Sequence, residues 1–384
     1  MTAFDPPKNV HIDPFRAMAV LDAAQARERA GLATYHFEVG QPGSLAPPSA
    51  RAAVAQALAQ DRMGYSASLG RPELREALAQ YYDTRYGVKV DPGQIVITTG
   101  ASGGIQLSLL ACFDKGARIG LTAPGYPAYR NMIQGLGFQP VLIEVGPQSN
   151  FQPTPHLLAG CGPLDGLIIA SPSNPTGTML SPSEFEAIYQ WCETSGVRLL
   201  SDEIYHGLTW GQPESTAAGR PGSHAIVLNS FSKYFSMTGW RVGWMVAPQD
   251  VLEMIERLSQ NLFICAPTVS QVAAQGALQD LDYLDEIVDG YRQREQLVAQ
   301  FARQWGLATQ AATDGAFYAY WNVSKYADSS TAFARRALDE AGAALVPGVD
   351  FDPINGEQFV RLSFAGAQDE VEAGLDALAR WLQK

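Results

Sequence analysis

The chain has 384 residues, a net charge of -12, a hydrophobic fraction of 46% and a charged fraction of 17%. This composition excludes intrinsic disorder, which needs few hydrophobic residues and many charges, and the length predicts two compact lobes. The acidic balance, without clustered Lys and Arg, argues against nucleic-acid and anionic-membrane partners, so we expect a small-molecule ligand.

The N-terminal residues 1–14 are rich in proline and polar groups, and we expect them to form an arm. The charged residues in this stretch fit neither a secretory signal nor a membrane span, so we expect a cytoplasmic location. Helical spacing follows over Pro14–Ala30, then a short strand over Tyr35–Gly43 and a helix over Ser49–Gln60.

Seven short apolar runs come next, separated mostly by helix-length segments, as a parallel sheet buried on both faces requires. They are Ile95–Thr99, Arg118–Thr122, Val141–Val145, Gly166–Ala170, Arg198–Asp202, Ala225–Asn229 and Val242–Ala247. Only twelve residues separate the last two runs, too few for a crossover helix, so we expect one antiparallel strand. The predicted fold class is α/β with a doubly wound, mostly parallel seven-stranded sheet.

The C-terminal third has an α+β pattern, which predicts a second, smaller lobe. Its expected helices are Val251–Ser259, Val269–Gln279, a long connecting helix at Leu284–Phe301, Thr331–Ala341 and Asp369–Gln383, with strands at Phe317–Val323 and Phe359–Phe364. We therefore predict an N-terminal arm and first helix (1–45) that pack with the small domain, a large domain (46–285) and a small C-terminal domain (286–384).

The four cysteines lie far apart in the sequence and form no CxxC pair. Neither a zinc site nor a disulfide framework is indicated, so we expect reduced cysteines and no metal.

The sharpest chemical signal is the segment Ser230–Gly243, SFSKYFSMTGWRVG. Lys233 can hold an aldehyde cofactor as an imine, while Ser230, Ser232 and Arg241 can bind a phosphate through two hydroxyls and one planar, permanently charged fork. Each residue alone has an ordinary interpretation as a surface or loop residue; the combination favours a cofactor site.

This segment resembles the lysine signature of the class I and II aminotransferases, which are fold-type I pyridoxal-phosphate enzymes. Three further matches follow the family's order: Ser171–Gly177 resembles its Asn-Pro-Thr-Gly turn, Asp202–Tyr205 its Asp-Glu-x-Tyr strand end, and Val360–Ser363 its carboxylate-binding strand. The resemblance covers about residues 12–380. It implies a fold-type I transferase with pyridoxal 5'-phosphate bound to Lys233 as a Schiff base.

The resemblance also assigns residues around the cofactor ring. Asp202, at a predicted strand end, would pair with the pyridine nitrogen and keep it protonated. Asn174 and Tyr205 would hydrogen-bond the phenolic oxygen, and Tyr126 would stack on the ring. For Tyr129 the alternative of a core tyrosine packed under the sheet stays open. Lys233, Asp202 and Tyr205 are the predicted catalytic residues.

The phosphate has a second predicted contact in the Gly-rich turn Thr99–Gly104, which follows a strand and precedes a helical pattern. The amides of Ala101 and Ser102 would then point outward at a helix N-terminus, where phosphate binds well. The turn has neither the dinucleotide nor the nucleotide glycine spacing, so its value depends on the lysine segment.

The substrate carboxylate is expected to bind Arg361, together with Gly40 and Asn174, because a guanidinium can hold and orient it. Tyr65 resembles a residue that reaches the phosphate of a neighbouring subunit, so the resemblance implies a homodimer with shared sites. Pocket walls are expected from separated apolar segments, which favours neutral or aromatic substrates over dicarboxylates. Those segments are Phe15–Met18, Tyr65 of the partner and Phe263–Ile264.

Taken together, these residues predict an aminotransferase that moves an amino group from an L-amino acid to a 2-oxo acid with ping-pong kinetics, Lys233 shuttling the α-proton. A carbon-sulfur β-lyase on the same fold remains an alternative, because the cofactor contacts do not fix which bond breaks. A cofactor-sensing transcription regulator would need a basic helix-turn-helix segment before the sheet, and a nicotinamide dehydrogenase would need the dinucleotide fingerprint. The sequence shows neither, which disfavours both alternatives. His206 and His224 are interpreted as structural, and Glu203 is expected to face away from the cofactor.

Overall fold

The computed structural model describes residues 12–60, 63–309 and 311–384, so most of the predicted arm lies outside the described residues. Its helices are α1 (Arg16–Arg29), α2 (Pro48–Ala59), α3 (Pro72–Tyr86), α4 (Gly100–Cys112), α5 (Pro127–Gly135), α6 (Pro155–Ala159), α7 (Pro182–Ser195), α8 (Gln249–Leu262), α9 (Thr268–Ala277), α10 (Leu281–Trp305), α11 (Ser330–Arg336) and α12 (Gln368–Leu382). Its strands are β1 (Tyr35–His36), β2 (Ile95–Thr98), β3 (Arg118–Ala123), β4 (Gln139–Glu144), β5 (Gly166–Ala170), β6 (Arg198–Asp202), β7 (Ile226–Ser230), β8 (Gly243–Val246), β9 (Tyr318–Asn322), β10 (Ala343–Ala344), β11 (Val346–Pro347) and β12 (Phe359–Ser363).

A seven-stranded sheet forms the larger part of the molecule, with the strand order β2-β8-β7-β6-β5-β3-β4. Strand β8 runs antiparallel to both of its neighbours, and the other pairings are parallel. The predicted mostly parallel sheet with one antiparallel strand is therefore confirmed. The one clear shift is β4, which begins two residues earlier than expected.

Alternation along the central strands supplies both faces of this sheet with apolar side chains. Leu167 and Leu199 pack on one face, and Ile168 and Leu200 pack on the other. Helices α4, α5 and α8 bury the second face, while α3, α6 and α7 cover the first. This sandwich explains why the strands are continuous apolar runs instead of alternating apolar and polar residues.

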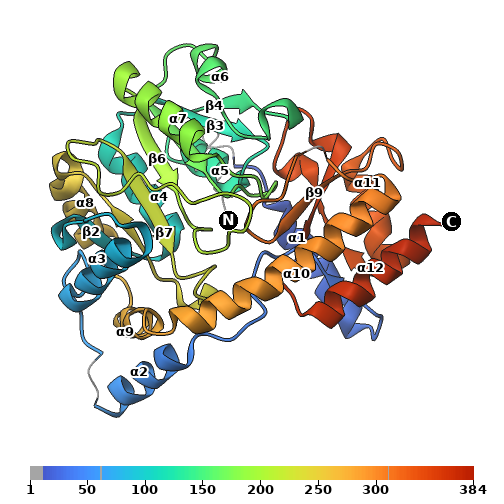
Figure 1. Ribbon diagram of the computed structural model, residues 1–384, viewed down its shortest axis with the longest axis horizontal. Coiled ribbons are helices and arrows are strands. Elements are labelled where there is room, and N and C mark those ends of the chain that lie inside the picture. The colour runs from blue at the N-terminus through green and yellow to red at the C-terminus, as the bar shows by residue number, and fades with distance from the viewer. Residues whose placement is uncertain (1–11, 61–62, 310) are drawn as a thin grey trace, which may run out of the picture.

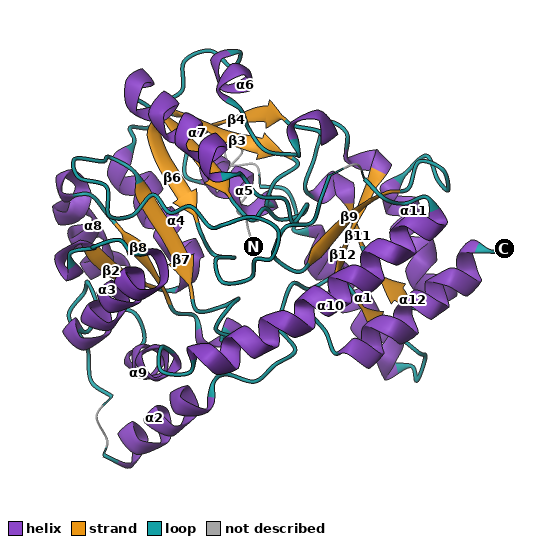
Figure 2. Cartoon of the chain, in the orientation of Figure 1, coloured by secondary structure: helices purple, strands orange, loops and turns teal. Residues whose placement is uncertain are grey.

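A smaller antiparallel sheet, β11-β12-β9, lies at the other end of the molecule with α11 and α12 (Figure 2). The short pair β1–β10 joins it to the N-terminal segment, and α1 packs against β10 and β11. The expected strand over Tyr35–Gly43 is only two residues long, and Val39 and Gly40, beyond its end, line the pocket described below. The predicted helix at Thr331–Ala341 is α11 followed by a π-helical turn over Ala337–Ala341.

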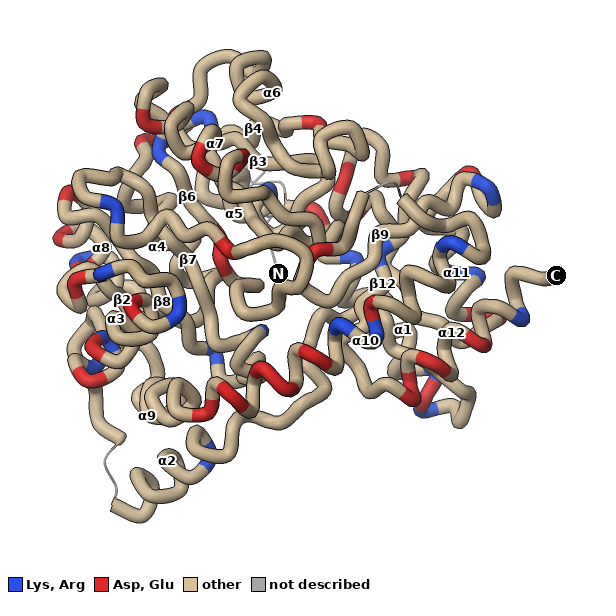
Figure 3. The backbone as a smooth tube through the Cα atoms, viewed as in Figure 1, with Lys and Arg blue, Asp and Glu red and all other residues tan. Residues whose placement is uncertain are grey.

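Helix α10 runs from the seven-stranded sheet to the smaller sheet (Figure 1). The predicted boundary at 285/286 lies inside this continuous 25-residue helix, and the division into domains stays a prediction. Acidic residues recur on several turns of α10, whereas Lys and Arg are spread over many elements (Figure 3). No helix in the described part of the chain is long and apolar enough to cross a membrane.

Candidate functional site

A pocket opens at the carboxyl ends of β5 and β6, where the two sheets face each other, and α1 forms part of its wall. Ligand crevices of open α/β sheets occur at such strand ends. Most of the predicted site residues line this pocket: Gly40, Ala101, Ser102, Tyr126, Asn174, Asp202, Tyr205, Ser232, Lys233, Arg241 and Arg361.

One end of the pocket is formed by the start of α4 and the loop before β8. Gly100 begins α4 directly after β2 with φ +76°, and a Cβ there would lie 2.7 Å from Nη2 of Arg241. Only glycine combines this left-handed backbone with such a close approach. Arg241 is exposed; its Nη1 donates to the Thr238 carbonyl at 3.1 Å and lies 3.5 Å from Oγ of Ser232. The amides at the start of α4, a hydroxyl and a guanidinium thus meet at one point.

Ser230 does not line the pocket, although it was predicted to bind the cofactor. It is buried at the end of β7, where its Oγ lies within hydrogen-bond distance of Oγ of Ser232, at 2.8 Å, and of the carbonyl of Val242, at 3.1 Å. Its contact with the pocket therefore runs through Ser232, because the chain turns between the two residues.

Asp202 lies at the end of β6 on the pocket floor, with 3% of its surface exposed. The Tyr129 hydroxyl donates to Oδ2 and the Ile204 amide donates to Oδ1. Burial raises the pKa of Asp202 to about 6, although the Tyr129 hydrogen bond opposes the shift. Tyr129 is thus a site residue that sequence reasoning left undecided; its position three residues after Tyr126, on the same side of a helical turn, was the available signal.

Lys233 places its amine inside the pocket, where Nζ donates to the carbonyl of Gly40 at 2.6 Å. Burial, together with the charges of Arg361 and Arg241, lowers the pKa of Lys233 to about 8, while the charge of Asp202 opposes the shift. A neutral amine is the nucleophilic form, so this environment prepares Lys233 to react with a carbonyl compound.

Arg361 on β12 is 3% exposed and has its guanidinium between two aromatic rings, 4.6 Å from the centre of Tyr318 and 4.7 Å from that of Phe351. Nη1 donates to Oδ1 of Asn174 at 3.1 Å, and Nη2 donates to the carbonyl of Glu38. Its Nε is buried without a hydrogen-bond partner. A buried, unpaired donor on a cation favours an anionic ligand such as a carboxylate.

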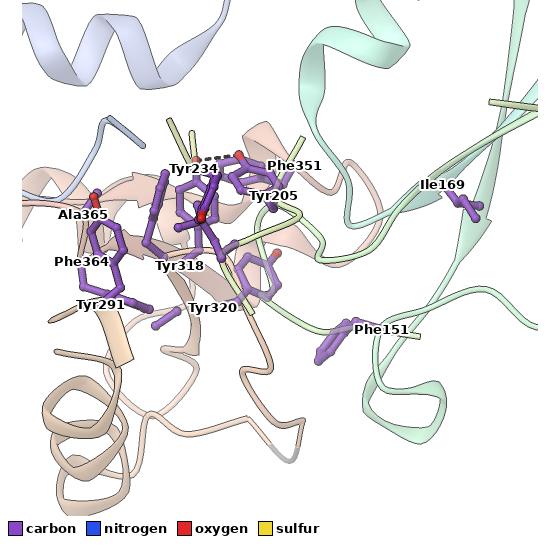
Figure 4. Close-up of a cluster of buried hydrophobic side chains, with 14 of the residues drawn as sticks. Phe151, Ile169, Tyr205, Tyr234, Tyr291, Tyr318, Tyr320, Phe351, Phe364 and Ala365 are labelled. Atoms are coloured by element: carbon purple, nitrogen blue, oxygen red, sulfur yellow. Dashed lines mark hydrogen bonds between the residues drawn. The ribbon is translucent and has the colours of Figure 1, made fainter. Parts of the chain in front are cut away.

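Tyr205 and Tyr318 meet hydroxyl to hydroxyl at 2.9 Å on the pocket wall. Figure 4 shows the two rings side by side in the buried aromatic cluster. Burial holds the pKa of both phenols above the ordinary value. Both are therefore neutral at physiological pH, and each has one proton to donate. Tyr318 was not predicted, because its only sequence signal was membership of an apolar strand.

Helix α1 brings Phe15, Ala17 and Met18 into the pocket wall, as expected for this segment. Its first turn has no side-chain cap of its own; instead, Asp350 accepts from the amides of Arg16 and Ala17 at 3.1 and 3.3 Å. No spacing rule connects residues 334 positions apart, so the role of Asp350 had no signal in the sequence.

The remaining predicted residues lie elsewhere. Tyr65 is 84% exposed beside a groove between α2 and α9, so its expected contact with a neighbouring subunit stays a prediction. Phe263 directly follows α8 and is partly buried against the core, Ile264 is half exposed, and neither lines the pocket of its own chain. His206 is buried, with Nδ1 3.5 Å from a carboxylate oxygen of Glu203. Nδ1 of His224 lies 3.5 Å from a carboxylate oxygen of Asp250. Glu203 does not line the pocket.

The donor set fits a phosphorylated aromatic aldehyde. A cation, a hydroxyl and helix amides lie at one end, a carboxylate lies on the floor, and the amine of Lys233 lies between them and Arg361. Within the described residues, no cluster of His, Cys, Asp and Glu has a metal-binding arrangement.

Comparisons with known proteins extend over nearly the whole chain. The family model described as aminotransferase class I and II matches residues 32–378. A valine–pyruvate aminotransferase from Mycobacterium tuberculosis is 44% identical over 97% of each chain, and an aspartate/prephenate aminotransferase from Thermus thermophilus is 30% identical over 96% of each. The crystal structure of an aminotransferase from Mycobacterium tuberculosis matches with a TM-score of 0.96 at 43% identity, covering 99% of this chain and 100% of the other.

Proposed function

Because this chain belongs to the class I and II aminotransferases and is a transaminase, we propose that it holds pyridoxal phosphate on Lys233 and transfers amino groups from neutral amino acids to pyruvate or a similarly small 2-oxo acid. Members of this family use pyridoxal phosphate. The observation that carries the proposal is the amine of Lys233, held in the pocket by the Gly40 carbonyl with Asp202 and Arg361 around it.

Pyridoxal phosphate, when bound, supplies an aldehyde for amine exchange and an electron-accepting ring that stabilises charge at the substrate's α-carbon. The start of α4, Ser232 and Arg241 would hold the phosphate. Asp202 would hold a proton on the pyridine nitrogen, and this cation would in turn keep Asp202 ionised.

The remaining groups orient the substrate and move its proton. Arg361 would bind the α-carboxylate through its unpaired edge, which turns the α-hydrogen toward Lys233. Lys233, whose pKa of about 8 leaves part of the amine neutral near physiological pH, would take that proton and return it. Asn174 accepts from Arg361 through Oδ1, so its amide NH₂ is free to donate to the phenolic oxygen of the cofactor. The hydroxyl of Tyr205 would donate to the same oxygen.

The charges in the pocket support a neutral donor. The cations among its described lining residues are Lys233, Arg241 and Arg361, each of which has a role above, so none is left for a second substrate carboxylate. The wall from α1 is apolar. The relative 44% identical is named for valine and pyruvate, which agrees with this preference.

The visible spectrum of the purified protein tests this function. An imine band that bleaches with valine, leucine or phenylalanine and returns with pyruvate is the expected result. Preferential use of aspartate would contradict the substrate, and absence of a band after adding pyridoxal phosphate would contradict the role of Lys233. Pyruvate and ammonia released from cystathionine without an oxo acid would instead favour the β-lyase.

The second part of the proposal is a homodimer with shared sites. It is supported by Tyr65, an aromatic residue 84% exposed beside an open groove, and by the exposure of Arg241. Light scattering after size-exclusion chromatography should give twice the 41.4 kDa chain mass. A monomeric, fully active enzyme would rule out the shared site.

A further inference from the structure

We propose that Tyr318 is a positioning residue that sets the direction in which Tyr205 donates its proton. The inference rests on the proposed function and adds to it a residue with no assigned role. Tyr318 lies on β9, is 2% exposed and lines the pocket, and its hydroxyl is 2.9 Å from that of Tyr205.

The hydroxyl of Tyr318 is held in place by the backbone beside Lys233. A Cβ on Gly40 would lie 1.8 Å from Oη of Tyr318, so the phenol occupies the space that any other residue would fill. The Gly40 carbonyl in turn accepts from Nζ of Lys233 at 2.6 Å. Tyr318 thus packs directly against the backbone that positions the amine.

The ring of Tyr318 is fixed as well. Its centre lies 4.6 Å from the guanidinium of Arg361, which also lies 4.7 Å from the centre of the Phe351 ring. Stacking of this kind holds a guanidinium in one plane. The ring of Tyr318 therefore contacts the carboxylate-binding Arg361, whereas its hydroxyl contacts that of Tyr205.

When two neutral phenols are hydrogen-bonded to each other, one hydroxyl donates its proton and the other accepts. If Tyr205 donates to the phenolic oxygen of the cofactor, only Tyr318 can donate across the 2.9 Å contact. Tyr205 then accepts from one phenol and donates to the pocket, and such a chain strengthens the outgoing bond. Removal of the Tyr318 hydroxyl should leave Tyr205 free to rotate its proton away from the pocket.

The test is Tyr318→Phe, which keeps the ring against Arg361 and removes only the hydroxyl. Weaker donation from Tyr205 stabilises the anionic phenolic oxygen less, so the pH midpoint of the cofactor's visible band should rise by about half a unit, a threefold change in proton affinity. We expect kcat to fall about tenfold and the KM for the amino-acid donor to stay unchanged, because the stacking remains.

Tyr320→Phe is the matched control. Tyr320 lies two residues further along the same strand and is equally buried, but its hydroxyl has no hydrogen-bond partner and it does not line the pocket. Its midpoint should equal that of the wild type. An equal midpoint in Tyr318→Phe, or a shift of the same size in Tyr320→Phe, would overturn the inference.

The double variant Tyr205→Phe/Tyr318→Phe gives a second, independent measurement. If Tyr318 acts through Tyr205, its substitution adds no further shift to that of Tyr205→Phe, whereas additive shifts would overturn the inference. A wild-type protein that forms no visible band with pyridoxal phosphate would refute the proposed function itself. A normal band and normal transamination with an unshifted Tyr318→Phe would refute the inference alone.

Discussion

The two ends of the pocket are built in opposite ways. At the phosphate end, Arg241 is exposed, and its partners Thr238 and Ser232 are close to it in the sequence. At the carboxylate end, Arg361 is 3% exposed, and its hydrogen-bond partners Asn174 and Glu38 lie 187 and 323 residues away in the sequence. An exposed charge keeps its hydration, whereas a buried one needs a partner for each of its donors. The phosphate end can therefore bind its ligand through several weak contacts, while the carboxylate end fixes the orientation of the group that it binds.

Lys233 lies between the two ends, and its substitution should have the largest effect. Lys233→Ala removes the group that moves the α-proton, so kcat/KM should fall by about 10⁴-fold or more. Phosphate and ring contacts remain, so the variant should still bind pyridoxal phosphate, measured by equilibrium dialysis. Full activity in this variant would refute the assignment of the amine, whatever the state of the two ends.

The contrast between the ends predicts unequal effects of the same Arg→Lys substitution. Arg361→Lys leaves a buried ammonium that cannot fill the slot between Tyr318 and Phe351, so kcat/KM for the amino-acid donor should fall about 100-fold. Arg241→Lys keeps an exposed charge near the phosphate and should weaken cofactor affinity about tenfold, with donor KM unchanged. Steady-state kinetics and cofactor titration measure the two effects. Equal losses in both variants would remove the distinction between the ends.

Asp202 allows the energetic cost of burying its ionised carboxylate to be measured in the absence of the cofactor. Its pKa in the folded apoprotein is about 6, above the ordinary 3.8, so ionisation opposes folding. The carboxyl contributes most stability below pH 4 and loses that contribution as pH rises through 6. Asp202→Asn should then raise the free energy of unfolding of the apoprotein at pH 7 by about 3 kcal/mol, with the gain vanishing toward pH 4, while activity falls. Urea melts across this range measure it; a gain independent of pH would exclude ionisation as the cause.

The same contrast explains what the sequence could predict. The phosphate end lies in two continuous segments, Thr99–Gly104 and Ser230–Gly243, where the residue types and their spacing indicate the chemistry directly. The strands were predictable because burial on both faces makes each an apolar run. Tyr318 and Asp350 act only through neighbours brought close by the tertiary fold, and no local pattern distinguishes them from core residues. Ser230 shows the converse: it belongs to the motif, but the turn places it behind Ser232.

The smallest effect on activity is expected for Asp350, which caps the N-terminus of α1, the helix that forms part of the pocket wall. Asp350→Asn removes one of the two acceptor oxygens that bind the Arg16 and Ala17 amides, together with the charge that favours a helix N-terminus. A cap of this kind contributes about 1 kcal/mol, so a looser wall at Phe15 should raise the KM for neutral donors about fivefold, with kcat nearly unchanged.

Asp352→Asn is the control for this change, because Asp352 is equally buried in the same loop but accepts from the Ile354 and Asn355 amides, not from α1. If α1 acts as a specificity wall, Asp350→Asn alone raises the donor KM, even where both variants lower the melting temperature alike. Parallel changes in KM for both would show that α1 responds to general loosening of the loop, and the carboxylate end would then lack the specific coupling that separates it from the phosphate end.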